Sequence, residues 1–104
     1  MGTKEWCHIL EKDFQKELVS ELKIMFPGCM VLKNDPNYIQ GIPDWIIIWK
    51  DKWATFEAKR SQNASVQPNQ AWYVNRMNEM SFSMFVYPEN KEEFLNAIQQ
   101  AFRS

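Results

Sequence analysis

The stretch IPDWIIIWKDKWATFEAK, residues 42–59, decides the fold of this chain. Residues 45–49 form an unbroken apolar run behind Asp44, which is typical of a strand buried on both faces in the middle of a sheet. Residues 50–52 form a polar turn, and residues 53–59 alternate between two faces. We therefore predict a β-hairpin over residues 44–59. One face of its second strand carries Trp53, Thr55, Glu57 and Lys59, and the other carries Ala54, Phe56 and Ala58.

Three segments outside the hairpin have the pattern of helices. The first is amphipathic over residues 6–25 and ends at Pro27-Gly28. The second begins at Pro68, a residue suited to the first turn of a helix. The third begins after Asn90, which forms a capping-box pattern with Glu93. The apolar residues expected to pack these last two helices are Trp72, Tyr73, Met77 and Met80 in the second and Phe94, Leu95, Ile98 and Phe102 in the third.

Two further strands complete the expected fold. They are predicted at residues 29–33 and 82–87, and polar loops are predicted at residues 34–41 and 60–67. The order is then α-β-β-β-α-β-α. A hairpin followed by a helical crossover to another strand predicts an α/β fold, in which a mixed sheet has helices on both faces.

Composition places the chain among globular proteins and narrows its function. At 104 residues and 45% hydrophobic it is expected to form a single domain over residues 1–104. Its net charge of −1 excludes a basic nucleic-acid coat protein, so any binding of nucleic acid needs a local patch or a bridging metal. There is no signal peptide pattern and no apolar run of the ~20 residues that cross a bilayer, so we expect a cytoplasmic protein with no membrane partner.

Two carboxylates and an ammonium group are expected to meet at one end of the hairpin. Asp44 begins the first strand, and Glu57 and Lys59 share a face near the end of the second. Carboxylate oxygens are suitable ligands for Mg²⁺, and the carbonyl of Ala58 can join them. A metal there polarises a phosphoryl oxygen and activates water, while a lysine orients that water or neutralises developing charge. The alternative is that Glu57 and Lys59 are the solvated face of an edge strand.

These residues resemble a known family. Pro43-Asp44 followed by Glu57-Ala58-Lys59 resembles the signature of the PD-(D/E)XK nuclease superfamily, whose core has the same α-β-β-β-α-β order. Within it, the segments at residues 41–44, 56–59 and 67–70 (GIPD, FEAK and QPNQ) resemble the VRR-NUC branch and small phage nucleases. The resemblance implies a restriction-endonuclease-like core with an additional C-terminal helix. The compact stand-alone form suggests a phage or prophage origin.

The resemblance also implies roles for individual residues. Asp44 and Glu57 would be metal ligands, Lys59 the catalytic lysine, and Gln70 a residue that supports the site. A glutamate on the first helix usually completes the metal site, and Glu11 matches it best, with Glu17 as the alternative. The implied cofactor is Mg²⁺, with Mn²⁺ able to substitute.

The implied substrate is DNA, especially structured or branched DNA. Basic candidates for phosphate contacts are Lys33, Arg60 and Arg76, and neutral candidates are Asn63, Gln67 and Asn69. A chain with one active site needs a homodimer to cut two strands or two arms of a junction.

Two other functions remain open from the sequence. One is a nucleic-acid-binding module with this fold but without catalysis, which the intact Asp44, Glu57 and Lys59 set opposes. The other is a protein-interaction module that uses the surplus Trp and Met residues. An exposed apolar patch away from Asp44, without metal binding, would favour the latter.

Overall fold

A four-stranded mixed sheet, in the order β1-β2-β3-β4, forms the centre of this protein. The structure is a computed structural model that describes residues 3–35 and 37–104, with side chains described from residue 12 onward. The elements are, in chain order, α1 (Thr3–Met25), β1 (Met30–Lys33), β2 (Trp45–Trp49), β3 (Lys52–Ala58), α2 (Pro68–Met80), β4 (Ser83–Val86), a 3-10 turn (Pro88–Asn90) and α3 (Lys91–Arg103).

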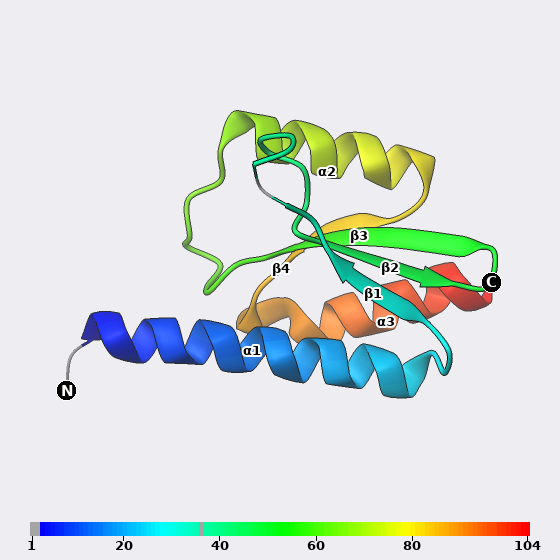
Figure 1. The fold of residues 1–104 in the computed structure, drawn as a ribbon, viewed down its shortest axis with the longest axis horizontal. Coiled ribbons are helices and arrows are strands. Elements are labelled where there is room, and N and C mark those ends of the chain that lie inside the picture. The colour runs from blue at the N-terminus through cyan, green and yellow to red at the C-terminus, as the bar shows by residue number, and fades with distance from the viewer. Residues whose placement is uncertain (1–2, 36) are drawn as a thin grey trace.

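The topology confirms the predicted α/β class. The pairs β1–β2 and β2–β3 are antiparallel, and β4 lies parallel to β3 after the crossover through α2. Helix α2 covers one face of the sheet, and α1 and α3 cover the other (Figure 1). The hairpin turn is tighter than predicted, because Trp49 pairs with Lys52 and leaves only two residues between the strands. None of the described helices has the length and apolarity that a membrane crossing requires.

The main core lies between the sheet and the pair α1 and α3. Helix α1 buries Phe14, Leu18 and Leu22 at the predicted spacing. From the sheet, Ile47 and Phe56 are fully buried on this face. The packing from α3 comes from Phe94, Leu95, Ile98 and Phe102, as predicted, and Phe94 lies 5.1 Å from Phe56 between ring centroids.

The opposite face of the sheet is only partly covered, which makes one prediction wrong. Strand β2 lies inside the sheet, but it is not buried on both faces, because α2 packs mainly on β3 and β4. The register pairs Met30 with Ile48 and Leu32 with Ile46, which puts all four on the side away from α1. Met30 remains 56% exposed, Leu32 43% and Ile48 37%. Strand β3, not β2, is the one buried on both faces.

Two predictions about helix ends and faces are confirmed only in part, because Asn90 is the N-cap residue of α3 and Tyr73 and Met77 are half-buried on α2. Trp72 and Met80 are mostly exposed on α2, while Val74 is buried there. At α3, Asn90 makes no side-chain cap hydrogen bond. Its amide accepts from the N–H of Tyr87 and donates to the carbonyl of Phe85 instead, because the preceding 3-10 turn directs it back toward β4.

Candidate active site

The hairpin brings Asp44 and Glu57 together. Trp45 pairs with Phe56, so continuing the antiparallel register by one residue places Asp44 opposite Glu57. The backbone N–H of Asp44 donates to Oε1 of Glu57 over 3.1 Å. Side chains at opposed positions of an antiparallel pair project from the same face, so both carboxylates lie on the face that carries α2.

The backbone at Asp44 is held by Asn34, a residue that the sequence did not single out. Its side-chain amide donates to the carbonyl of Pro43 over 2.7 Å, and its backbone N–H donates to the carbonyl of Asp44 over 2.7 Å. These two bonds close the loop between β1 and β2 and fix the start of β2. The only sequence signal was an asparagine at the edge of a loop, which is common and unspecific.

Gly41 holds the same loop against the first turn of α2. Its φ is +92°, and a Cβ there would lie 2.6 Å from the side chain of Asn69 and 3.0 Å from its backbone. A larger residue would therefore be strained and would push the loop away from α2. The predicted contact residue Asn69 is thus next to the loop that leads to Asp44.

Gln70 links Lys59 to Glu57 through its side-chain amide. Its Oε1 accepts from Nζ of Lys59 over 3.0 Å and from the backbone N–H of Gln67 over 3.0 Å. Its Nε2 donates to Oε2 of Glu57 over 3.4 Å. This arrangement fixes the orientation of the amide, because only its oxygen can accept from the ammonium.

Asp44, Glu57, Lys59 and Gln70 form a cluster that is largely shielded from water. It contains two carboxylates and only one ammonium group. The side chain of Glu57 is 7% exposed and that of Lys59 15%, and Nζ of Lys59 lies 4.0 Å from Oε2 of Glu57. The pKa of Glu57 is raised from an ordinary value of 4.5 to about 7. Burial is the largest cause and the charge of Asp44 adds to it, while Lys59 and the Asp44 N–H lower the pKa.

A divalent cation fits this pair of carboxylates. Two facing acids, one of them buried, provide hard oxygen ligands, and a cation would offset their repulsion. Ala58, whose carbonyl was a predicted ligand, is the buried last residue of β3 between Glu57 and Lys59. Within residues 12–35 and 37–104, no cluster of three or more histidine, cysteine, aspartate or glutamate side chains is arranged for a metal.

The helix carboxylate that would complete the set is not among the described side chains. Glu11 lies on α1, and its side chain is outside the described part of the structure. The alternative, Glu17, forms an ion pair with Lys91 of α3. Glu17 therefore joins two helices on the core side and does not reach the carboxylate pair.

The predicted nucleic-acid contacts are divided between two places. Exposed residues at the site end are Arg60, Asn63, Gln67 and Asn69, in the loop after β3 and at the start of α2. Lys33 ends β1 at the same end of the sheet. Arg76 lies six residues along α2 from Gln70, about 9 Å along the axis, and is paired with Glu79 over 3.7 Å. The structure therefore does not bring Arg76 to the site.

Comparison of this chain with family models, with curated proteins and with solved structures gave no match.

Proposed function

We propose that this protein is a Mg²⁺-dependent endonuclease of the PD-(D/E)XK type, with a restriction-endonuclease-like core, that hydrolyses phosphodiester bonds in DNA. One observation carries the proposal. A buried glutamate faces an aspartate across a hairpin, beside a lysine that is held by a glutamine. A protein that needed only a stable sheet would gain nothing from burying a second carboxylate beside the first.

Each residue of the cluster has a role in the proposed reaction. Asp44 and Glu57 hold Mg²⁺ or Mn²⁺, with the carbonyl of Ala58 and with Glu11 as further candidate ligands. When bound, the metal supplies Lewis acidity to the phosphate and activates water. Lys59 directs its ammonium group to the attacked phosphate and stabilises the charge that develops there. Gln70 keeps Nζ of Lys59 in place through the 3.0 Å hydrogen bond.

We further propose structured or branched DNA as substrate and a homodimer as the active form. Asp44 and Glu57 form one candidate site in each chain, so cleavage of two strands would require two chains. The partly uncovered apolar face formed by Met30, Leu32, Ile46 and Ile48 is the surface we assign to the second copy. Sedimentation that finds only a monomer, with and without DNA, would contradict the dimer but not the nuclease.

The decisive experiment is a cleavage assay with labelled duplex, single-stranded, flap and four-way-junction DNA in Mg²⁺ or Mn²⁺. We expect metal-dependent cleavage that EDTA stops. Asp44→Ala and Lys59→Ala should each lower it by at least about 100-fold, the usual cost of losing one electrostatic element of a catalytic site. Arg76→Ala is the matched control and should cut normally, because Arg76 lies away from the cluster. Cleavage that survives both substitutions would refute the site.

The same exposed apolar face supports a second candidate function, a protein-interaction module that lacks catalysis. Met30, Leu32 and Ile48 leave a contiguous apolar surface on β1 and β2. Absence of cleavage on every DNA substrate, together with absence of Mg²⁺ binding by calorimetry in both wild type and Asp44→Ala, would favour this function over the nuclease.

A further inference from the structure

A groove on the α1 side of the sheet gathers basic side chains at the same end as the carboxylates. Its volume is about 620 Å³, within the range of grooves that hold ligands. Lys12, Gln15 and Lys16 of α1 form one wall, and Lys33 of β1 and Trp45 of β2 form the other. Trp45 directly follows Asp44 in the chain, so the groove begins beside the candidate site.

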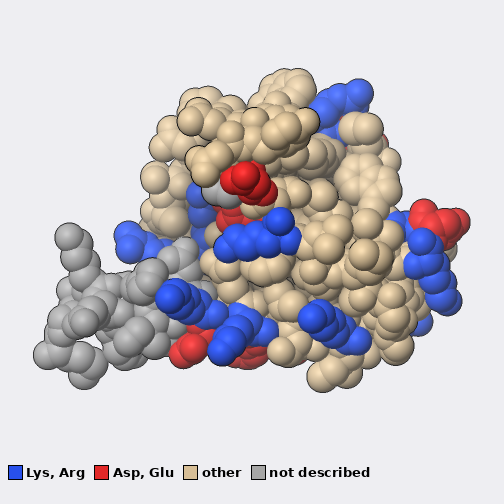
Figure 2. All heavy atoms as spheres, viewed as in Figure 1, with Lys and Arg blue, Asp and Glu red and all other residues tan. Residues whose placement is uncertain are grey.

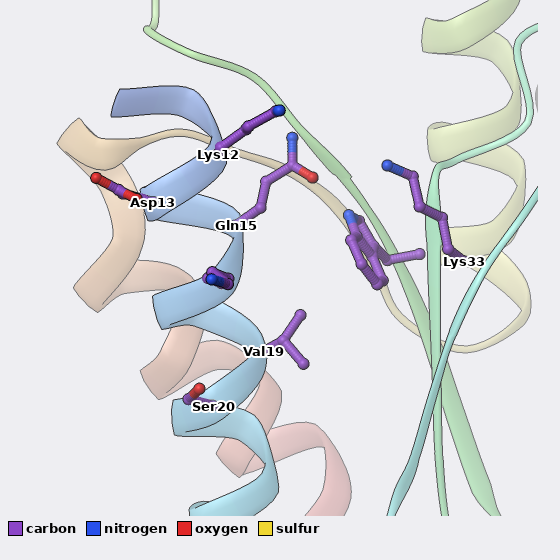
Figure 3. Close-up of a pocket in the computed structure, with 8 residues that line it drawn as sticks. Lys12, Asp13, Gln15, Val19, Ser20 and Lys33 are labelled. Atoms are coloured by element: carbon purple, nitrogen blue, oxygen red, sulfur yellow. The ribbon is translucent and has the colours of Figure 1, made fainter. Parts of the chain in front are cut away.

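The basic side chains of the groove converge, and among the described residues none of them forms an ion pair with an acid. Lys12 and Gln15 reach from α1, and Lys33 reaches from β1, toward the same space, while Asp13 points away from it (Figure 3). No ion pair among the described side chains involves Lys12, Lys16 or Lys33. Lys91 is different, because it lies between Glu17 and Glu21. Basic side chains are spaced along the α1 side of this face, with another at its centre (Figure 2).

Trp45 forms a rigid part of the groove wall through its ring. Its ring stacks on Phe56 with a centroid distance of 6.2 Å and an interplanar angle of 11°, and Nζ of Lys33 lies 5.2 Å from the ring centroid. Its indole N–H is buried and has no hydrogen-bond partner among the described residues. Because this N–H is itself buried, Trp45 contributes its ring to the wall of the groove and not a hydrogen-bond donor.

These features select an extended anion. The Cβ atoms of Lys12 and Lys16 are separated by one helical turn, about 5–6 Å, and Lys33 faces them from the sheet. Three ammonium groups spread along a groove match successive phosphates of a strand better than a single small anion.

We propose that this groove binds the phosphodiester backbone of one DNA strand next to the bond that is cut. The inference rests on the proposed nuclease function and extends it. Asp44 and Glu57 project on the α2 side of the sheet, and the groove lies on the α1 side, so the strand passes around the end of β1 and β2. The proposal adds a second set of DNA-binding residues to those in the polar loops near the site. These are Lys12, Gln15, Lys16 and Trp45, which act together with Lys33.

The test measures binding in EDTA, where no cleavage occurs. Fluorescence anisotropy of a labelled single-stranded oligonucleotide and of a labelled duplex compares wild type with the triple variant Lys12→Gln, Lys16→Gln, Lys33→Gln. All three lysines are exposed, so thermal melting should be unchanged and will show that the variant folds. Lys23→Gln is the control, because Lys23 is an exposed lysine on the same helix outside the groove. A competition series with inorganic phosphate distinguishes a strand from a free anion.

We expect the triple variant to bind DNA at least about tenfold more weakly at 0.1 M salt, and the slope of log K against log salt to fall by about 2. Lys23→Gln should change neither quantity substantially. Equal slopes for the triple variant and Lys23→Gln would overturn the proposal, as would competition by inorganic phosphate at the phosphate concentration of the oligonucleotide. Asp44→Ala should still bind DNA. If the wild type binds through these lysines but never cuts, the groove stands and the nuclease fails.

Discussion

The middle and the end of β3 bury polar side chains in opposite ways. Thr55 and Glu57 project from the same face of the strand, under the same helix, and both residues are buried. Thr55 is neutral and forms a 2.7 Å hydrogen bond with Ser83 of β4, next to the sulfur of Met77. Glu57 instead faces Asp44, a like charge, with Lys59 4.0 Å away.

The difference separates a buried polar pair that stabilises the fold from the pair to which we assign a function. At Thr55 each buried hydroxyl has a partner, so burial has little electrostatic cost. At Glu57 burial and the neighbouring aspartate oppose ionisation, so the folded state is less stable when the glutamate is charged. Thr55 lies only two residues before Glu57 on the same strand. It shows that this face of the sheet can bury a neutral, hydrogen-bonded pair in place of two carboxylates. Perturbed groups of this kind concentrate at functional sites.

The largest expected effect comes from removing the charge with Glu57→Gln. Folding raises the pKa of Glu57 from 4.5 to about 7, so the folded protein holds this proton more tightly than the unfolded chain does. Wild type should therefore lose stability as the pH rises from about 4.5 to about 7, by about 3 kcal/mol in total. The variant should lack this loss and be the more stable protein at pH 8, while being inactive.

Urea unfolding of both proteins in EDTA at several pH values between 5 and 8 measures this difference. Thr55→Val serves as the control, since its change carries no charge. If wild type and Glu57→Gln have parallel pH profiles, the middle and the end of β3 do not differ electrostatically, and the comparison fails.

A smaller effect is expected from Gln70→Ala, which removes the link between Lys59 and Glu57. Nζ of Lys59 loses its 3.0 Å acceptor, so cleavage should slow by about tenfold, equivalent to about 1.4 kcal/mol. The loss should appear in kcat and leave the KM for DNA nearly unchanged, because the residue positions Lys59 and does not hold substrate. Asn75→Ala, an exposed change on the same helix, is the matched control. A rise in KM with normal kcat would assign Gln70 to substrate binding instead.

The smallest expected effect is that of Thr55→Val. The variant keeps the shape of the side chain and leaves the hydroxyl of Ser83 without its 2.7 Å partner, so stability should fall by about 1 kcal/mol at every pH. The double variant with Ser83→Ala should recover most of this loss. DNA cleavage by Thr55→Val should equal that of wild type, and a substantial fall in kcat would mean that the middle of β3 also serves the site.

The sequence predicted the parts of the site whose geometry follows from local rules. A hairpin must return the end of its second strand to the start of the first, so Asp44 and Glu57 could be paired without a structure. Gln70 was found through the family resemblance, and the structure places it beside Lys59 and Glu57.

The missed residues depend on contacts between elements that the local pattern does not specify. Asn34 holds Asp44 from the far side of a loop, and Gly41 touches Asn69 of α2. Nothing in the local sequence around Lys12 indicates that Lys33 and Trp45 lie across a groove from it. The apolar run of β2 predicted burial on both faces, but its partial exposure was decided by where α2 packs.

The spacing of the site in the chain has a consequence for folding. The hydrogen bonds that join Asp44, Glu57, Lys59 and Gln70 link residues 11 or 13 positions apart. The contacts that join α1 to α3 and to the C-terminus link residues 74 and 78 positions apart. Closing short loops has a lower entropic cost and is faster than closing long ones. The candidate site is thus local in the chain, while the scaffold that supports it depends on contacts between the two ends of the chain.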